Sequence, residues 1–443
     1  MAEQKKSSGI DWIGDIPNNW EISRIKYHYQ ISLGKMLQPI QENSADTLEH
    51  YMCSANITWA GVDTSILKQM WFSPAEKRQY RLLDGDLLVS EGGDVAVSCI
   101  WRNELDECYL QNAVHRVRQN ALSDNRFIYY WLFFLKNYGI IDLICNKATI
   151  AHFTKEKFGE LPICIMSIDE QVTIADFLDK ECAQIDSIAA DLEKQIALLQ
   201  QYKKSLITET VTKGLNKSVP MKDSGIEGVG KIPSHWKVNR LKYAAVVKTG
   251  PFGTQLSASE YSDEGIPVIN VKNIGYGTII EDDLDYVPDE VCQRLAQHQL
   301  QLGDIVFGRK GAVDKHAIIT ESQIGWVQGS DCIRVRIDGD IDSRYLNYLF
   351  DTVYFAEYVL LYAVGTTMAS INSDILTNSK ILVPPITEQR CIADFLDSSC
   401  KTLFEIIENK QSQLATLQHH KKSLIYEYVT GKKRVKEVRQ DGH

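Results

Sequence analysis

The chain has 443 residues, 44% of them hydrophobic, and its formal net charge is −10 at pH 7. This length allows two to four domains of about 100–200 residues, each with a buried core. The negative charge excludes a protein that coats nucleic acid without selectivity, although it allows basic groups confined to one face. It also favours partner subunits that share the binding of phosphates.

Neither a membrane segment nor a secretory signal is expected. The sequence contains no run of about 18 apolar residues, and its first residues, MAEQKKSSGIDW, include no apolar stretch. The ten cysteines are scattered without any CxxC pair, which is typical of reduced thiols in a cytosolic protein. We therefore expect a cytoplasmic protein that does not contact a membrane.

The chain contains an internal duplication, the feature that most strongly decides the fold of a repeat protein. The first block matches its copy at ten of twenty positions, the second at nine of fourteen and the third at ten of fourteen. The sequence offset is 216 for the first block and 218 for the other two, so the regions between the blocks have nearly equal lengths. The paired blocks are 8–27 with 224–243, 169–182 with 387–400, and 199–212 with 417–430.

Between the blocks, each half contains a body that has diverged from the other. In the first body, short strands are expected at 86–90 and 114–117, with a turn at 91–94 and a helix at 127–137. This mixture predicts an α+β globule with loop-rich edges. Trp20, at the start of this body, has the matching Trp236 in the second half. Both are expected to be packing anchors rather than base-stacking residues.

A long helix is predicted over 168–213, with Asp169 as its N-cap and Lys213-Gly214 as its end. Each long helix would contain about 40 residues and extend about 60 Å. The natural partner of each is the other, as a rigid spacer, although two unrelated dimerisation helices are an alternative. Seven of nine positions with steps of three and four are apolar or aromatic, as in a coiled-coil seam: 178, 181, 185, 188, 192, 195, 199, 202 and 206.

The second half begins with GIEGVGK at 225–231, which fits the spacing of a phosphate-binding loop. Ile232 follows where such a loop needs Ser or Thr, and the first copy has Asp15 where Lys231 stands. We therefore interpret the segment as a turn. The second body repeats the mixed pattern, with strands at 305–307 and 333–337, and is followed by a second, weaker helical seam from 386 onward.

No catalytic signature is found for methyl transfer, nuclease cleavage or a helicase. The ten histidines are dispersed, so no metal site is expected. The chain is predicted to be a non-catalytic reader without a cofactor of its own. Two alternatives remain open, namely a self-contained DNA methyltransferase or nuclease, and a scaffold without a DNA role.

DNA contacts would come from polar loop residues of the bodies. Arg and Lys can pair with guanine or phosphate, Asn and Gln with adenine, and Ser or Thr with either. Gly308-Arg309-Lys310-Gly311 is the strongest candidate, because small residues let the backbone approach a groove. For any single candidate the alternative is an ordinary solvated loop residue. The candidates are Ser90, Ser98, Arg102, Lys147, Thr149, His152, Lys155, Lys248, Thr249, Gln255, Arg309, Lys310, Lys315, His316, Thr367 and Asn372.

The residues that the copies share resemble a known family. The frame IPSHWKVNRLKY at 232–243, the box PPITEQRCIADFLD at 384–397 and KKSLIYEYVTG at 421–431 are similar to the specificity subunit of type I restriction–modification enzymes. The resemblance covers both halves in order. The first half departs from it at Met166-Ser167, where the second has Pro384-Pro385.

This resemblance implies an α+β protein in which each of two target-recognition domains reads one half of an asymmetric, interrupted DNA site. Two long helices, packed as an antiparallel coiled coil with a pseudo-twofold repeat, would set the spacer and dock two methyltransferase subunits. Double-stranded DNA and restriction/translocase subunits are the other implied partners. The expected segments are 1–167 and 215–385 for the domains, 168–214 and 386–431 for the helices, and 432–443 for a basic tail that is expected to be a disordered end.

Overall fold

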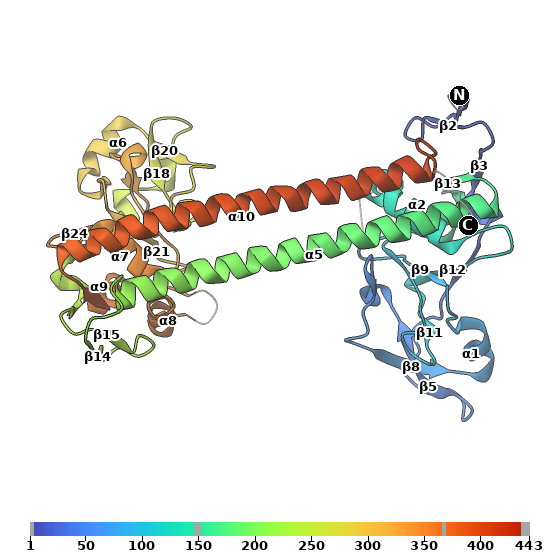
Figure 1. The fold of residues 1–443 in the computed structure, drawn as a ribbon, viewed down its shortest axis with the longest axis horizontal. Helices are drawn as coiled ribbons and strands as arrows, with labels where there is room; N and C mark the ends of the chain where they lie inside the picture. The colour runs from blue at the N-terminus through green and yellow to red at the C-terminus, as the bar shows by residue number, and fades with distance from the viewer. Residues whose placement is uncertain (1–3, 146–151, 366–368, 436–443) are drawn as a thin grey trace, which may run out of the picture. The chain divides into compact units, whose positions relative to one another are not determined.

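The computed structural model, drawn in Figure 1, describes residues 4–145, 152–365 and 369–435. It divides into two compact units, residues 1–193 with 412–443, and residues 194–411. Each unit combines one globular body with parts of both long helices. We call the bodies the first head and the second head. Both contain the mixed helices and strands that the sequence predicts.

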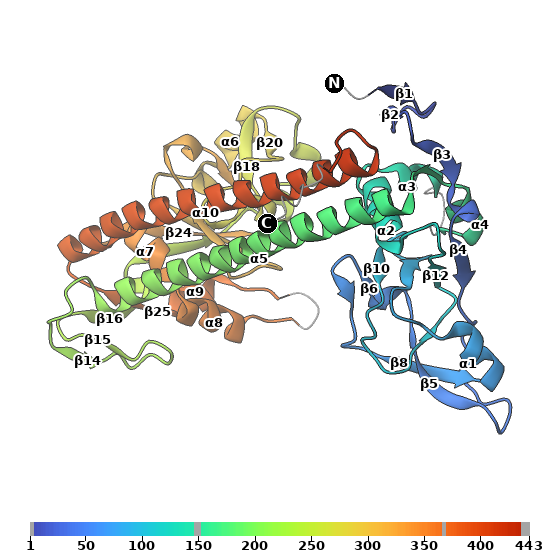
Figure 2. The same cartoon turned by 45° about the vertical axis from the view of Figure 1, so that its right-hand side comes forward.

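The first head is built on a four-stranded antiparallel sheet with the strand order β10-β9-β12-β4, and α2 packs against β9 and β10. Figure 2 shows α2 beside β10. Strand β9 is buried along its whole length, because its apolar residues follow one another without alternation. A smaller sheet has the order β11-β5-β8. The elements are β1 (Lys5–Ser7), β2 (Asp15–Pro17), β3 (Glu21–Arg24), β4 (Gln30–Leu33), β5 (Thr47–Met52), β6 (Ile57–Thr58), β7 (Gly61–Val62), β8 (Lys68–Phe72), α1 (Pro74–Tyr80), β9 (Leu87–Ser90), β10 (Ser98–Ile100), β11 (Tyr109–Leu110), β12 (Val114–Arg118), α2 (Asn125–Asn137), α3 (Ile140–Ile144), α4 (Lys155–Glu160) and β13 (Pro162–Ile165).

The second head has a five-stranded sheet with the order β17-β24-β21-β22-β19 and a smaller sheet with the order β20-β18-β23. Its central strands β24, β21 and β22 pair antiparallel, as β12, β9 and β10 do in the first head. The elements are β14 (Met221–Asp223), β15 (Lys231–Pro233), β16 (Lys237–Arg240), β17 (Ala245–Thr249), β18 (Ile266–Ile269), β19 (Tyr276–Gly277), β20 (Asp285–Val287), α6 (Asp289–Arg294), β21 (Ile305–Gly308), β22 (His316–Ile318), β23 (Val327–Gln328), β24 (Cys332–Ile337), α7 (Ser343–Phe350), α8 (Val353–Tyr362), α9 (Ser373–Asn378) and β25 (Lys380–Val383).

An antiparallel strand pair leads into each long helix. In the first unit β3 pairs with β13, and in the second β16 pairs with β25. Trp20 and Trp236 lie beside these pairs, and both are fully buried within the cores of their units. The prediction that the two tryptophans are packing anchors is therefore confirmed.

The long helices are α5 (Ile168–Lys213) and α10 (Ile386–Val429), of 46 and 44 residues. Gly214 and Gly431 follow their last turns with φ of +73° and +69°, a conformation that favours glycine at a helix end. The predicted N-cap at Asp169 is wrong by two residues. The Ser167 hydroxyl accepts the hydrogen bond from the Glu170 amide at 3.3 Å, and Asp169 lies inside the first turn.

The buried stripe of α5 differs from the predicted seam at two apolar positions. Ile188 is 49% exposed and Tyr202 is 56% exposed, whereas Leu192 is buried and Ile196 is half-buried. The other apolar positions of the predicted seam, Leu178, Ile185, Leu192, Leu199 and Leu206, are buried or half-buried. The structure therefore agrees with most of the predicted apolar row and departs from it at Ile188 and Tyr202.

Each unit holds the two helices together by its own contacts. In the first unit the Lys421 ammonium pairs with Asp186 at 2.7 Å, and the Phe177 and Tyr428 rings lie 4.4 Å apart. Residue numbers rise along α5 as they fall along α10, so the helices run in opposite directions there. In the second unit Lys410 donates to the Gln195 side chain at 2.6 Å.

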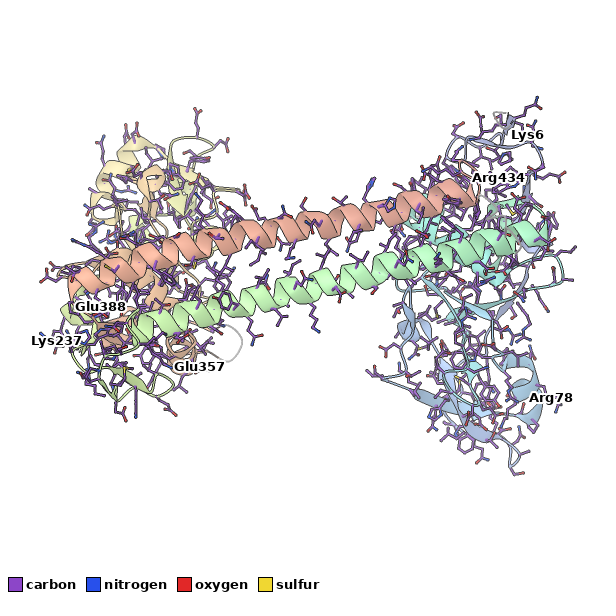
Figure 3. The ribbon with its side chains drawn as sticks, in the orientation of Figure 1. Lys6, Arg78, Lys237, Glu357, Glu388 and Arg434 are labelled. Carbon is purple, nitrogen blue, oxygen red and sulfur yellow. The ribbon has the colours of Figure 1, made fainter. Side chains whose placement is uncertain are left out.

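The described part of the basic tail packs on the first unit, which corrects the expectation of a disordered end for these residues. The Arg434 guanidinium, labelled in Figure 3, pairs with Glu170 and lies 5.6 Å from the centre of the Trp20 ring. Lys432 donates to the Asp15 carbonyl at 2.6 Å. Residues 436–443 lie outside the described residues. Within the described ranges, no helix combines the length and apolar character that spanning a bilayer requires.

Candidate nucleic-acid interface

In the first head, four loops are tied together by backbone hydrogen bonds at the end of β9. The Glu91 amide donates to the Ala113 carbonyl, and the Glu91 carbonyl accepts from the Phe153 amide, both at 2.9 Å. The Lys35 amide donates to the Leu110 carbonyl at 2.8 Å. We call this region the first loop edge, made of residues 34–37, 91–94, 111–113 and 152–154.

The second head repeats this arrangement at the end of β21. The Arg309 amide donates to the Asp331 carbonyl at 2.8 Å, and the Arg309 carbonyl accepts from the Ile371 amide at 2.9 Å. The Gly250 amide donates to the Cys332 carbonyl at 2.9 Å. The second loop edge is made of residues 249–252, 309–312, 329–331 and 369–371.

A glycine fixes one loop in each edge. A Cβ added at Gly34 would collide with the backbone of Gln111, and one added at Gly250 would collide with the Gly329 carbonyl. Only glycine allows so close an approach of two backbones. The loop that follows each glycine is therefore held at a fixed position against the neighbouring turn.

A buried histidine supports the first loop edge, and an arginine–aspartate pair closes the opposite end of each main sheet. His115, fully buried on β12, donates from Nε2 to the Phe153 carbonyl at 2.6 Å, and burial lowers its pKa, which favours the neutral ring. At the other end of the first sheet Arg118 holds Asp86 through a pair of bonds at 2.6 and 2.7 Å. Arg336 and Asp304 make the same pair in the second head, at 2.6 and 2.8 Å.

Three predicted contact residues need correction, because their side chains are buried. The Ser90 hydroxyl donates to the Asp94 carbonyl at 2.5 Å, and the Ser98 hydroxyl donates to the Ala96 carbonyl at 2.9 Å. His316 is 1% exposed and its Nε2 donates to the Asn347 carbonyl at 3.1 Å. All three stabilise the sheets and turns of their own heads and therefore do not belong to the candidate surface.

The second loop edge contains three of the remaining candidates of its head, and Lys315 and Asn372 lie just beyond it. Thr249 and Arg309 are half-buried, and Lys310 is exposed and pairs with Asp331 at 3.0 Å. The Lys315 carbonyl accepts a hydrogen bond from the Gly308 amide. The Lys315 ammonium lies 5.5 Å from the centre of the Tyr276 ring. Asn372 follows Ile371 directly, and its side chain caps α9 by accepting from the Ile375 amide at 3.0 Å.

Arg309 is the least constrained of these cations. Its backbone is fixed on both sides, but its guanidinium has no hydrogen-bond or ion-pair partner among the described residues. A fixed backbone with a free planar donor group suits bidentate pairing with guanine.

The other candidates lie at the margins of the loop edges, away from them, or outside the described residues. In the first head, the exposed His152 and Lys155 adjoin Phe153 at the loop edge. Arg102 lies beyond the opposite end of β9, since β10 pairs antiparallel with that strand. Lys248 donates to the Gln297 side chain at 2.7 Å, and Gln255 lies three residues beyond Phe252. Lys147, Thr149 and Thr367 lie outside the described residues.

Glu91 is absent from the sequence-based candidates, although it occupies the position of Arg309 in the first loop edge. Burial raises the pKa of its half-buried carboxyl, a shift that Glu156 adds to and His152 opposes. A carboxylate accepts from the cytosine amino group, whereas a guanidinium donates to guanine. The offset of 218 between the copies pairs Glu91 with Arg309 and Gly93 with Gly311, but a glutamate and an arginine share no chemistry that would have marked Glu91 as a candidate.

Among the described residues no cluster of His, Cys, Asp or Glu could hold a metal ion. The two loop edges present donors and acceptors on a fixed backbone frame, together with exposed cations at their margins. This arrangement can bind and distinguish polar groups.

Comparisons with known proteins agree with this picture. Over 439 residues the chain is 25% identical to the type I restriction enzyme MjaVIII specificity subunit of Methanocaldococcus jannaschii, covering 96% of this chain and 95% of that protein. It is 23% identical over 256 residues to the EcoKI specificity subunit of Escherichia coli, covering 56% of this chain and 53% of that subunit.

Two solved structures share the fold. One, described under the assembly and conformational transition of the type I R-M system, has a TM-score of 0.65 at 14% identity, over 94% of this chain and 98% of that one. The HsdS subunit from Thermoanaerobacter tengcongensis has a TM-score of 0.51 at 15% identity, over the same shares. Residues 18–198 and 233–416 match the family described as the type I restriction modification DNA specificity domain, and the chain therefore belongs to that family.

Proposed function

We propose that the chain is the DNA-recognition subunit of a type I restriction–modification complex, in which each head reads one half of an asymmetric bipartite target. One observation carries this proposal. The two loop edges share a backbone frame but place opposite charges, Glu91 and Arg309, at the same position. Equal frames with unlike reading groups fit two unlike half-sites.

The long helices are proposed to form an antiparallel coiled coil that sets the spacer between the half-sites. The opposite directions of α5 and α10 in the first unit and the Lys410–Gln195 contact in the second support this. Sites held apart by a rigid element fix the half-site spacing in other DNA readers as well. Together the two heads and helices would form a pseudo-twofold repeat.

Two methyltransferase subunits are proposed to dock on the repeated parts, one for each copy, and restriction/translocase subunits to join them. Methyl transfer and cleavage would then belong to the partners, which must extrude the target base from the duplex. A self-contained enzyme is the competing proposal. Methylation or cleavage of DNA by the purified chain alone would favour it over a non-catalytic subunit.

Exchanging one head tests the modular assignment. Residues 20–165 are replaced by the corresponding segment of a relative with a different target, and the chain is expressed with its methyltransferase partners. Sequencing of methylated genomic DNA then identifies the recognised motif. We expect one half of the motif to change and the other half and the spacer to stay. A change in both halves, or in neither, would overturn the modular reading.

A further inference from the structure

A large apolar side chain is exposed at the same position of both loop edges. Met36 is 76% exposed and Phe252 is 63% exposed. They correspond at the offset of 216 that relates the entry frames, and each stands two residues after the glycine of its loop, Gly34 or Gly250. The two residues differ in type but share size and apolar character, within bodies that have otherwise diverged.

Each of these side chains follows residues whose backbone is held in place by hydrogen bonds and packing. The Lys35 amide and carbonyl bind the Leu110 carbonyl and the Asn112 amide, both at 2.8 Å. The Lys35 side chain is only 6% exposed, pairs with Glu76 and lies 5.2 Å from the Phe72 ring. Met36 therefore follows a residue whose backbone and side chain are both anchored.

The backbone before Phe252 is restricted in a comparable way. Gly250 is bonded to Cys332 and packed on Gly329, and Pro251, directly before Phe252, has a fixed φ. The Phe252 carbonyl accepts from the Gln255 amide at 3.2 Å. Neither Phe252 nor Met36 belongs to a hydrophobic cluster of the described residues. Their exposure is therefore not explained by core packing.

The loop that carries each side chain is bonded to the same turn as the proposed reading position of its head. The turn that binds Lys35 continues into Ala113, whose carbonyl binds the Glu91 amide. In the second edge, the turn that binds Gly250 includes Asp331, which binds the Arg309 amide. A duplex that reached Glu91 or Arg309 would thus also meet an exposed apolar side chain on a rigid loop.

We infer that Met36 and Phe252 are apolar wedges that enter the base stack of the two half-sites; this inference rests on the proposed function. Met and Phe are among the residues that proteins insert between base steps to unstack and kink DNA. Insertion would bury surface that is otherwise left in water. It would also make recognition depend on the ease of unstacking one base step, which is a property of sequence.

The test uses the full chain assembled with its methyltransferase subunits, and duplexes that carry the target identified from methylated genomic DNA. The fluorescent base 2-aminopurine is placed at one position at a time, avoiding the methylated base. We expect binding of the unsubstituted complex to raise its fluorescence at one step in each half-site. Met36→Ala should abolish the rise in one half-site only, and Phe252→Ala in the other only. Each variant should bind roughly ten- to a hundredfold more weakly.

Leu83→Ala and Leu302→Ala are matched controls. Both leucines are exposed and apolar, and they precede β9 and β21, at the ends of these strands opposite the loop edges. They should leave the fluorescence and the affinity unchanged. If the alanine variants at 36 and 252 behave like these controls, or if no position brightens in the unsubstituted complex, the wedge is excluded.

Two further outcomes would overturn the wedge or the proposed function. If replacing thymine by uracil weakens binding as much as the alanine variants do, without any change in stacking, the side chains touch thymine methyl groups in the groove and do not enter the stack. An unsubstituted complex that does not prefer the target over a scrambled duplex would overturn the proposed function itself, before any variant is measured.

Discussion

At the scale of residues, position 91 of the first head and position 309 of the second are opposite in charge on one backbone frame. Both amides donate to a neighbouring turn, and both carbonyls accept from a backbone amide, that of Phe153 or of Ile371. The frame therefore constrains the backbone in the same way in both heads, and the two side chains are what differ. On the proposed function, a substitution at either position changes the base preference of one half-site and leaves the frame intact.

Replacing Arg309 by alanine should weaken recognition of the second half-site by ~1–3 kcal/mol, because a bidentate pair with guanine would be lost. The loss should concern one base pair, so the methylated motif relaxes at one position. Lys310→Ala is the comparison: Lys310 is exposed and paired with Asp331, so its loss should weaken binding without preference for one base pair. Binding measured on duplexes with each base substituted in turn distinguishes the two. A uniform loss for Arg309→Ala would assign it to a phosphate.

Acid should weaken reading of the first half-site through Glu91. Burial raises the pKa of this carboxyl, with His152 opposing the shift and Glu156 adding to it. As the pH falls, Glu91 therefore takes up a proton earlier than an ordinary glutamate does. It then no longer has two oxygens free to accept from a cytosine amino group. Glu91→Gln, which cannot titrate, should bind with a flatter pH profile between pH 7 and about 5. Identical profiles for the two proteins would exclude a reading role for Glu91.

Gly34→Ala should disorder the first loop edge and destabilise the first head by about 1–3 kcal/mol, because the added Cβ collides with the backbone of Gln111. Gly92→Ala is a matched control in the same edge, since a Cβ there meets nothing within 4 Å. Thermal unfolding and half-site binding should change for Gly34→Ala alone. Equal behaviour of the two variants would contradict a close-packed role for Gly34.

At the scale of elements, a duplicated ion-pair cluster joins each head to its long helix. Arg126 at the start of α2 pairs with Asp176 at 2.5 Å and Asp179 at 3.0 Å on α5, and Tyr130 donates to Asp179 at 2.7 Å. In the second unit, Arg344 of α7 makes the equivalent pairs with Asp394 and Asp397 of α10. The carboxylates raise the pKa of both guanidinium groups, against the opposing effect of burial.

Arg126→Ala should destabilise the first unit by about 1–3 kcal/mol, because it leaves the carboxylates of Asp124, Asp176 and Asp179 without their cation. Arg344→Ala should have a smaller effect on the second unit, since the Arg344 side chain is 41% exposed and Arg126 is 24% exposed. Differential scanning calorimetry, with the unfolding of each unit assigned by limited proteolysis, measures both. A larger loss for Arg344→Ala would contradict the ranking by exposure.

The elements that the sequence predicts well are those that the duplication repeats. Both long helices and the buried tryptophans follow from aligned blocks, because matching residues with a helical period need no knowledge of distant contacts. The loop edges could not be found this way. They depend on strand pairing that brings Lys35, Glu91 and Phe153 together from distant parts of the chain. The prediction of Ser90 and Ser98 as DNA contacts fails for the same reason, because the polarity of the local sequence shows neither the burial of their side chains nor the carbonyls that their hydroxyls bind.

At the scale of the whole molecule, the formal charge of −10 limits what the chain can do alone. Within the loop edges, Lys35 is paired with Glu76 and Lys310 with Asp331. Few cations of the described loop edges are thus free to neutralise phosphates, and phosphate contacts supply most non-specific affinity. Tight binding is therefore expected to need the partner subunits, while this chain supplies the choice of sequence.

The spacer of the target should depend on helix length. Inserting seven residues after Glu193 and seven after Gln411, where the two compact units meet in sequence, adds two helical turns to α5 and α10 while keeping the 3.5-residue repeat in register. Each helix lengthens by about 10 Å. Since a base pair rises about 3.4 Å, the methylated motif should gain about three base pairs between unchanged halves. The same insertion in α5 alone leaves its turns unmatched and should abolish methylation. Recovery of the original spacer in the doubly lengthened protein would show that the helices do not set the distance.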